Sequence, residues 1–263
     1  MKQYLAAGLL TCGGLIYASA LWEALAGYPI NPAISFLSEL AARDQPDGWI
    51  FRVTDAVSGT LIVLGTLLLM LGRPRWGRLR WILTCALTLT GIGTVLDAAS
   101  PMDCAESVPQ CHERVTEGSV SIFHHLHIAT STVAATGIVI AALSYLAILA
   151  HRRDLVSRLE AATAAAASIL LLSLSVQGLL GLVGSPHGWA QRLQVLATAM
   201  FIMSIAWQLA RWSRVDFPHD LVEFPLGDPT RPGYTAAGLR GAGGAPERAG
   251  TQLVGPSRHS ARH

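Results

Sequence analysis

Hydrophobic residues along this chain occur in long runs, and most polar residues lie between the runs. An α-helix needs about 20 mainly apolar residues to cross the hydrocarbon core of a bilayer. Six runs approach or exceed that length, and they cover approximately residues 4–26, 49–71, 81–99, 120–150, 159–183 and 189–211. No run shows the alternation of polar and apolar positions that is typical of outer-membrane strands. The pattern therefore predicts an all-α, polytopic membrane bundle of six transmembrane helices.

The first run permits two interpretations. Lys2, the apolar stretch after it and the segment Ala18-Ser19-Ala20 are together similar to a secretory signal peptide with a small-residue cleavage site. The apolar run continues beyond that site to Ala26, which favours a helix that is retained. Under both interpretations the loop that follows the first run lies outside the cytoplasm.

Arginine residues are concentrated in every second connection between the runs and directly after the last run. These arginines are Arg73, Arg75, Arg78, Arg80, Arg152, Arg153, Arg158, Arg211 and Arg214. The other connections hold only Arg43 and Arg114. Basic residues of membrane proteins are enriched in cytoplasmic loops. We therefore expect a multi-pass protein of the plasma membrane with both termini in the cytoplasm.

The composition supports a membrane protein and excludes several other classes. Of the 263 residues, 51% are hydrophobic and only 14% are charged, whereas soluble domains carry about 25% charged residues. A net charge of +2 in so apolar a chain argues against nucleic-acid binding. Four cysteines are too few for a disulfide-rich secreted scaffold. The expected partner is the lipid bilayer.

The chain changes character after the sixth run. Proline, glycine and arginine dominate the end of the chain, and a segment of that composition cannot bury a hydrophobic core. We therefore expect a six-helix transmembrane domain over residues 1–212. Residues 213–263 are expected to form a disordered cytoplasmic tail.

Ionisable residues within the predicted spans lie mostly near the ends that face away from the cytoplasm. They are Glu23, Arg52, Asp55, Asp97, His124, His125, His127 and Arg192. An Asp or Arg at the centre of a membrane helix carries a penalty of about 2.5–3.5 kcal/mol, which shrinks near the interface. Contact with lipid headgroups is therefore the favoured explanation for Glu23 and Arg192. Arg52 and Asp55 are three residues apart on one helix face, so we expect them to pair.

The three histidines at the start of the fourth run suggest a polar site. His124 and His127 share a helix face, whereas His125 points away from it. Two histidines and Asp97 are suitable zinc ligands, and His187 before the sixth run is a further candidate. A zinc-bound water would attack an ester or amide. A metal-free acid/base site, a structural cluster and a proton or ligand relay are the alternatives.

The first outer loop has apolar residues at near-helical spacing, which are Ile34, Leu37 and Leu40. This spacing predicts an amphipathic helix at the membrane surface, with Ser38 and Glu39 on its polar side. Ser38 is a candidate nucleophile, although no G-x-S-x-G motif surrounds it. The alternative role of Ser38 and Glu39 is helix capping and contact with solvent.

Two of the cysteines lie in the third connection, which is predicted to be outside the cytoplasm. An oxidising location favours a disulfide between Cys104 and Cys111. Zinc ligation is the lesser alternative, because the gap between the two cysteines is wider than the usual spacing of zinc ligands. The disulfide would close a small loop beside Asp103, between Asp97 and the predicted histidine-bearing helix.

The order of these motifs resembles a bacterial integral-membrane family known as domain of unknown function 998. The matching segments are Ser38-Glu39-Leu40 after the first span, Asp97 with Pro101-Met102-Asp103 after the third, and the stretch from His125 to Ala129. The resemblance covers about residues 5–210 and implies six spans, and the family has no established activity to carry over. A looser similarity to ceramidase-like and adiponectin-receptor-like hydrolases, which place Ser, Asp and His around zinc, is an analogy that rests only on the same residue types.

Three classes of function are consistent with the sequence. The first is a membrane enzyme, such as a metal-assisted hydrolase of lipid-like molecules, with Ser38, Glu39, Asp55 and Asp97 as catalytic candidates. The second is a transporter or small-molecule-binding protein that uses the same cluster as a relay. The third is a non-catalytic component of a membrane complex. The run pattern shows no broken helix or inverted repeat, which argues against transport.

Overall fold

The structure is a computed structural model that describes residues 1–72, 76–152, 155–183 and 186–213. The chain divides into two units, Met1–Val222 and Glu223–His263, and every described residue belongs to the first. The predicted disordered tail lies, apart from Ser213, outside the described residues. Arg73, Arg75 and Arg153 of the arginine-rich connections also lie outside them.

The described part of the chain is helical and contains no strand. Its elements are α1 (Lys2–Tyr17), α2 (Ser19–Leu25), the 3-10 helix η1 (Leu37–Ala41), α3 (Gly48–Leu71), α4 (Arg78–Ala99), α5 (Pro109–Thr116), α6 (Ile122–Ala150), α7 (Arg158–Leu182) and α8 (Gly188–Trp212). Within these residues, five helices are long and apolar enough to cross a bilayer, and the bent pair of α1 and α2 adds a sixth span. The prediction of an all-α bundle of six spans is confirmed.

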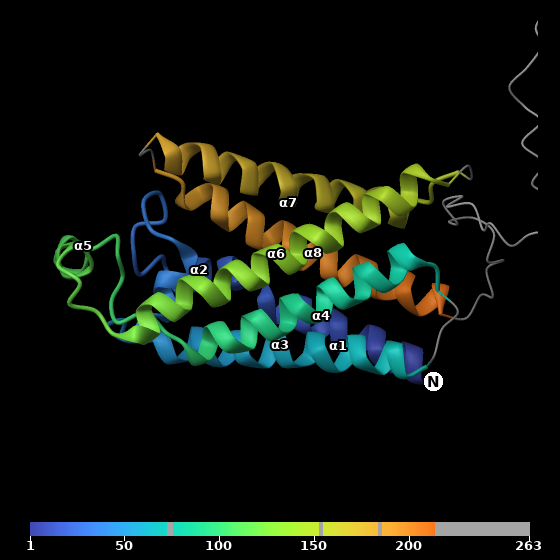
Figure 1. Cartoon of the computed structure of the whole chain (residues 1–263), viewed down its shortest axis with the longest axis horizontal. Helices are drawn as coiled ribbons and strands as arrows, with labels where there is room; N and C mark the ends of the chain where they lie inside the picture. Colours follow the sequence, from blue (N-terminus) through green and yellow to red (C-terminus); the bar gives the residue numbers. More distant parts are fainter. Residues whose placement is uncertain (73–75, 153–154, 184–185, 214–263) are drawn as a thin grey trace, which may run out of the picture. The chain divides into compact units, whose positions relative to one another are not determined.

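The long helices run along a common direction and leave α5 at the end of the bundle opposite the N-terminus (Figure 1). We call this end of the bundle the α5 end. It also holds α2, η1 and the polar residues that the sequence singled out. Large apolar side chains such as Leu172 and Leu179 are exposed along the outside of the bundle, as expected for helices that face lipid tails.

The first span is broken, which corrects the expectation of an uninterrupted helix. α1 ends at Tyr17, Ala18 leaves the helical region at φ −69° and ψ 50°, and α2 begins at Ser19 with a bend of 44°. Alanine is the best helix former, so the sequence holds no local signal for a break here. The indole of Trp22 donates a hydrogen bond of 3.1 Å to the Ile16 carbonyl beside the break.

Small residues allow the central helices to pack closely. A Cβ atom placed on Gly59 of α3 would lie 2.6 Å from the Gly91 carbonyl oxygen of α4, which is far inside van der Waals contact. A Cβ atom on Gly137 of α6 would lie 2.7 Å from the Thr90 backbone nitrogen of α4. Membrane helices associate through such small residues because lipid supplies no hydrophobic force between them. These contacts hold α3, α4 and α6 together.

A buried polar cluster ties α6, α7 and α8 together at the end of the bundle opposite the α5 end. The Tyr145 hydroxyl lies 3.0 Å from Gln208 Oε1, and Gln208 Nε2 donates to Thr163 Oγ1 at 2.6 Å. The Tyr145 ring also packs against Phe201 and Trp212. Paired polar groups of this kind join helices without leaving an unsatisfied donor in the membrane. These hydrogen bonds and ring contacts join α6, α7 and α8.

Candidate functional site

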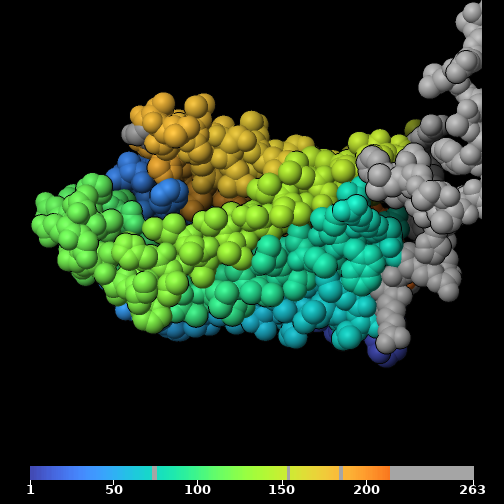
Figure 2. All heavy atoms as spheres, in the orientation of Figure 1, coloured from blue at the N-terminus to red at the C-terminus, as the bar shows by residue number. Residues whose placement is uncertain are grey.

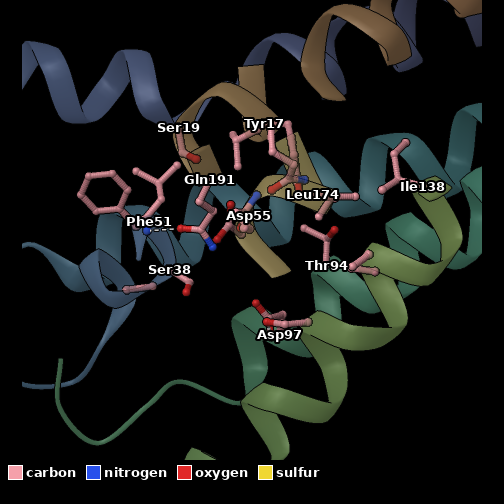
Figure 3. Close-up of a pocket in the computed structure, with 18 residues that line it drawn as sticks. Tyr17, Ser19, Ser38, Phe51, Asp55, Thr94, Asp97, Ile138, Leu174 and Gln191 are labelled. Atoms are coloured by element: carbon pink, nitrogen blue, oxygen red, sulfur yellow. Dashed lines mark hydrogen bonds between the residues drawn. The ribbon is translucent and has the colours of Figure 1, made fainter. Parts of the chain in front are cut away.

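A cavity of about 200 Å³ lies at the break between α1 and α2. Side chains from α1, α2, η1, α3, α4, α6, α7 and α8 line it (Figure 3). The lining residues with polar side chains are Tyr17, Ser19, Ser38, Asp55, Thr94, Asp97, Ser131, Gln177, Gln191 and Gln194. The lining holds two carboxylates and, among the described residues, no lysine, arginine or histidine. The cavity is therefore acidic.

The candidates drawn from the sequence do not include most of this lining, because they were chosen among ionisable residues and residues of the connecting loops. Gln177, Gln191 and Gln194 have polar amides inside predicted spans, and this was the signal that marked them. The Nε2 atom of Gln177 is buried without a hydrogen-bond partner. An unpaired amide in a buried place is costly, so it indicates a position where a ligand or water completes the contacts.

Asp97 is held on one side by α6. Its Oδ1 atom accepts hydrogen bonds from Thr130 Oγ1 at 2.7 Å and Ser131 Oγ at 2.8 Å, and His127 Nδ1 lies 3.1 Å away. The imidazole is not oriented for a hydrogen bond, and both of its ring nitrogens are buried without a hydrogen-bond partner. His127 therefore lies close to Asp97 without a hydrogen bond to it. All of these contacts reach Oδ1, so Oδ2 is the atom that a ligand can use.

Asp55 contributes the second carboxylate, and its expected pairing with Arg52 is wrong. Arg52 Nη1 instead donates to the backbone carbonyls of Ala41 at 2.7 Å and Ala42 at 3.4 Å, which join α3 to the end of η1. A guanidinium satisfied by carbonyl oxygens does not need a carboxylate partner. Figure 3 shows Asp55 and Asp97 turned toward the same space.

η1 covers the cavity and replaces the predicted surface helix. Ser38 lines the cavity, whereas Glu39 is buried and bonds away from it. Glu39 Oε1 accepts from the Phe36 backbone N–H at 2.9 Å, and Oε2 accepts from the Ser107 N–H at 3.0 Å and from the Ser107 hydroxyl. The expectation that Glu39 faces solvent is therefore wrong, because protein donors take the place of water around the carboxylate. The hydrogen bonds of Glu39 therefore link η1 to the segment that precedes α5.

The histidines at the start of α6 have different surroundings. His124 and His127 are buried and His125 is exposed. His124 Nε2 lies 2.8 Å from Glu106 Oε1, and His124 Nδ1 accepts a hydrogen bond of 3.3 Å from the Asp103 backbone N–H. His124 thus anchors the loop between α4 and α6, whereas His127 approaches Asp97.

His187, the third zinc candidate, packs against the Phe36 ring with 4.5 Å between ring centroids. Across the described residues, no group of three His, Cys, Asp or Glu side chains is arranged to hold a metal ion. The donor set therefore does not fit a resident zinc ion. Zinc binding stays a prediction from the sequence that no cluster of these side chains supports.

Glu23 and Arg192 pair with each other, which corrects the expectation that both reach lipid headgroups. Their relative exposures are 0% and 3%, and Arg192 Nε donates to Glu23 Oε2 at 2.6 Å while Nη2 donates to Oε1. Arg192 Nη1 also donates to the carbonyl oxygens of Pro32, Ser35 and Gly188. The ion pair joins α2, the connection between α2 and α3, and α8, and thereby holds the helix break in place. The signal for this pair in the sequence is that two opposite charges lie near the ends of two predicted spans.

The loop between α4 and α6 is closed by a disulfide between Cys104 and Cys111, whose Cα atoms are 5.7 Å apart. Cys111 lies in α5, so the bond fixes that short helix to the loop. The Ala105 backbone N–H donates to Asp44 of the connection between α2 and α3 at 3.2 Å. The two connections at the α5 end therefore support each other.

Asp103 of this loop accepts hydrogen bonds from the Ser121 backbone N–H and from the Ser121 hydroxyl, the latter at 2.8 Å. Arg43 Nη1 lies 3.4 Å from its Oδ1 atom. Burial of the carboxyl acts to raise its pKa, but the Ser121 hydrogen bonds and the positive charge of Arg43 outweigh that effect and lower the pKa below its usual value. Asp103 therefore anchors the start of α6 in its ionised form.

We expect Asp103→Asn to increase amide hydrogen exchange at Ser121 about tenfold at neutral pH, because a hydrogen bond to a charged group is lost. Since the folded-state pKa is lowered, the stabilisation is complete above the ordinary carboxyl pKa. It is lost as the pH falls through the folded value, below about pH 4. The wild-type and variant rates, corrected for intrinsic exchange, should therefore converge in acid. Glu113→Gln, an exposed change on α5, is the control and should leave Ser121 unaffected.

Comparison with protein families gives a match over most of the chain. A family model described as "Protein of unknown function (DUF998)" matches residues 10–208, which is more than half of the chain and includes every residue that lines the cavity. Neither a curated protein nor a solved structure matches the sequence. The resemblance stated from the motifs is confirmed at the level of the family.

Proposed function

We propose that this membrane protein, which belongs to the DUF998 family of proteins of unknown function, binds a small cation in the acidic cavity. The description of the family names no activity, so the proposal rests on the site itself. The observation that carries it is the pair Asp55 and Asp97, which line one cavity without a basic residue in the described lining.

The chemistry of the cavity favours a cation with an organic surface. Carboxylates inside a membrane protein are costly unless a positive charge or hydrogen-bond donors accompany them. Oδ1 of Asp97 has such donors, whereas Oδ2 and the Asp55 carboxylate are left for the ligand. The aromatic rings of Tyr17 and Phe51 also line the cavity, and aromatic faces attract ammonium groups.

Transport is a second candidate, and the break between α1 and α2 is the observation that favours it. Discontinuous helices in secondary transporters place their unwound backbone at the substrate site. Tyr17 and Ser19 stand on either side of the break, and both line the cavity. Both a transporter and a protein that only binds its ligand have to bind the cation, so binding is tested first.

We also propose that the α5 end faces away from the cytoplasm, in the plasma membrane. The distribution of arginines supports this orientation. The disulfide between Cys104 and Cys111 lies at the α5 end and supports it independently, because disulfides persist in oxidising compartments. In this orientation the cavity lies in the half of the protein next to the outside.

Tetramethylammonium, a compact cation without other functional groups, is the probe for the binding function. We expect saturable binding to the purified full-length protein in nanodiscs, measured by calorimetry. Asp55→Asn should weaken binding about tenfold or more, because a charged contact in the cavity is lost.

Asp47→Asn is the matched control, since Asp47 is an exposed aspartate that precedes α3 at the same end of the bundle. It should retain the wild-type affinity. Absence of saturable binding by the wild type, or equal affinities of wild type and Asp55→Asn, would contradict the proposed function.

A further inference from the structure

The end of α7 stands away from the rest of the bundle. Its last buried residue is Ser173, and all described positions from there to Leu182 are exposed or partly exposed. A Cβ atom placed on Gly178 or Gly181 would meet no atom within 4 Å. Figure 2 shows a hollow between α7 and α6, with α8 visible in its depth.

The acidic cavity reaches both of the helices that border this hollow. Leu174 and Gln177 of α7 line the cavity on one side, and Ser131, Ala134 and Ala135 of α6 line it on the other. Both helices are membrane spans, so an opening between them faces the bilayer. Apart from Ser131 and Gln177, the side chains of α6 and α7 that line the cavity are apolar, and they are Ala134, Ala135, Ile138 and Leu174. A molecule that enters between the two helices therefore passes apolar side chains before it reaches the carboxylates, which lie on α3 and α4.

The volume of the cavity limits which part of a ligand it holds. At about 200 Å³ it is smaller than ordinary ligand pockets of about 300–1,000 Å³. It therefore accommodates a head group, and an attached chain has to remain between α6 and α7 or in the lipid. An apolar chain in that position stays in contact with apolar surroundings, so it is not a barrier to binding.

Gln177 indicates a third feature of the ligand. Its buried Nε2 atom is a donor without an acceptor, and it lies on α7, one of the two helices that border the hollow, whereas the carboxylates lie on α3 and α4. A ligand oxygen between head group and chain would accept this hydrogen bond. A ligand that enters between α6 and α7 therefore meets apolar side chains and the Gln177 amide on these two helices before it meets the carboxylates of α3 and α4.

We propose that the ligand is a single-chain amphipath whose cationic head group is linked to its chain through an oxygen acceptor, and that it enters from the membrane between α6 and α7. This inference rests on the proposed binding function and names the class of molecule that the same site takes. The cation contacts Asp55 and Asp97, the linking oxygen accepts from Gln177, and the chain lies beside Ala135.

Three probes of increasing size separate these contacts. They are tetramethylammonium, acetylcholine and lauroylcholine, which present the head group alone, the head group with an ester oxygen, and both with an apolar chain. Affinity is measured in nanodiscs below the critical micelle concentration of lauroylcholine, and binding to empty nanodiscs is subtracted. We expect lauroylcholine to bind the wild type at least about tenfold more tightly than tetramethylammonium.

Ala135→Trp places an indole in the path of the chain and leaves both carboxylates untouched. The ratio of its affinities for lauroylcholine and tetramethylammonium should fall from at least about tenfold to about one, and an unfolding transition like that of the wild type shows that the variant is folded. Ala129→Trp, at an exposed position of the same helix, is the matched control and should bind all three probes as the wild type does.

Gln177→Leu tests the oxygen contact through a different helix. It should weaken acetylcholine and lauroylcholine about tenfold relative to tetramethylammonium, since a buried hydrogen bond is lost only with the esters. This variant keeps the inference testable if the tryptophan variant does not fold.

The outcomes distinguish this inference from the binding function on which it rests. Failure of the wild type to bind tetramethylammonium overturns both. Binding of tetramethylammonium together with equal lauroylcholine affinity in the wild type and Ala135→Trp overturns the route between α6 and α7 alone. A disulfide-linked dimer of Gly178→Cys in liposomes would show that a second copy covers the opening, and that result also overturns the route.

Discussion

Replacing Arg192 by methionine is expected to lower the free energy of unfolding by about 3–5 kcal/mol, because the change leaves the Glu23 carboxylate buried without its partner. Glu23 is completely buried, and both of its oxygens accept hydrogen bonds from the guanidinium. The change also removes the donors that hold the carbonyl oxygens of Pro32 and Ser35 in the connection between α2 and α3. Few single changes in this protein remove so many buried contacts together.

The measurement is equilibrium unfolding in mixed micelles. Arg192→Lys should be intermediate, since an ammonium keeps the charge but lacks the planar fork that reaches both oxygens of Glu23. The double variant Glu23→Leu with Arg192→Met should recover part of the loss, because no unpaired charge remains. Arg211→Met, at the exposed end of the same helix, is the matched control. Equal stabilities of Arg192→Met and Arg211→Met would refute the structural role of the ion pair.

The same ion pair connects stability to the site. Glu23 lies in α2, directly after the helix break, and Arg192 lies in the first turns of α8 next to Gln191 and Gln194 of the cavity wall. Loss of the pair therefore releases the part of the first span that bends away from α1. We expect the ligand site to be disrupted at lower denaturant concentration than the central helices in Arg192→Met.

Gly137→Ala is expected to lower the free energy of unfolding by about 1–3 kcal/mol, which is the usual cost of overpacking. The added methyl group would lie 2.7 Å from the Thr90 backbone nitrogen and 2.8 Å from the Ala86 carbonyl oxygen. Backbone atoms cannot rotate away as a side chain does, so α4 and α6 have to separate. That separation also moves Asp97 relative to its partners Thr130 and Ser131, because they lie on these two helices.

Gly178→Ala supplies the control for this change. Both glycines lie in membrane helices, but a Cβ atom at Gly178 meets nothing within 4 Å. The control should be neutral or slightly stabilising, since alanine restricts the unfolded chain more than glycine does. Unfolding in mixed micelles measures both variants, and an equal effect at the two positions would show that helix propensity and not helix contact sets the cost.

Features that depend on neighbouring residues in the chain were predictable. The six spans follow from run length, because a bilayer imposes one minimum length on every helix that crosses it. The burial of His124 and His127 together, with His125 exposed, follows from the helical repeat. The family assignment follows from the order of short motifs along the chain.

Features that depend on which helices touch were not predictable in the same way. Arg52 and Asp55 have the spacing of a pair on one helix, yet Arg52 bonds to carbonyl oxygens at the end of η1. Glu39 has the spacing of a solvent-facing residue, yet it meets donors from a loop far along the chain. Spacing describes directions on a single helix and carries no information on the partner that a helix face meets.

The sequence by itself determined the membrane class, the number and limits of the spans, the family and the end of the bundle where polar residues collect. The tertiary structure alone decided the break at Ala18, the pair of Glu23 with Arg192 and the cavity that contains Asp55 and Asp97. The physical reason is that crossing a bilayer is a requirement on each helix separately. A cavity is the space that several helices leave unfilled, so it exists only after they have packed.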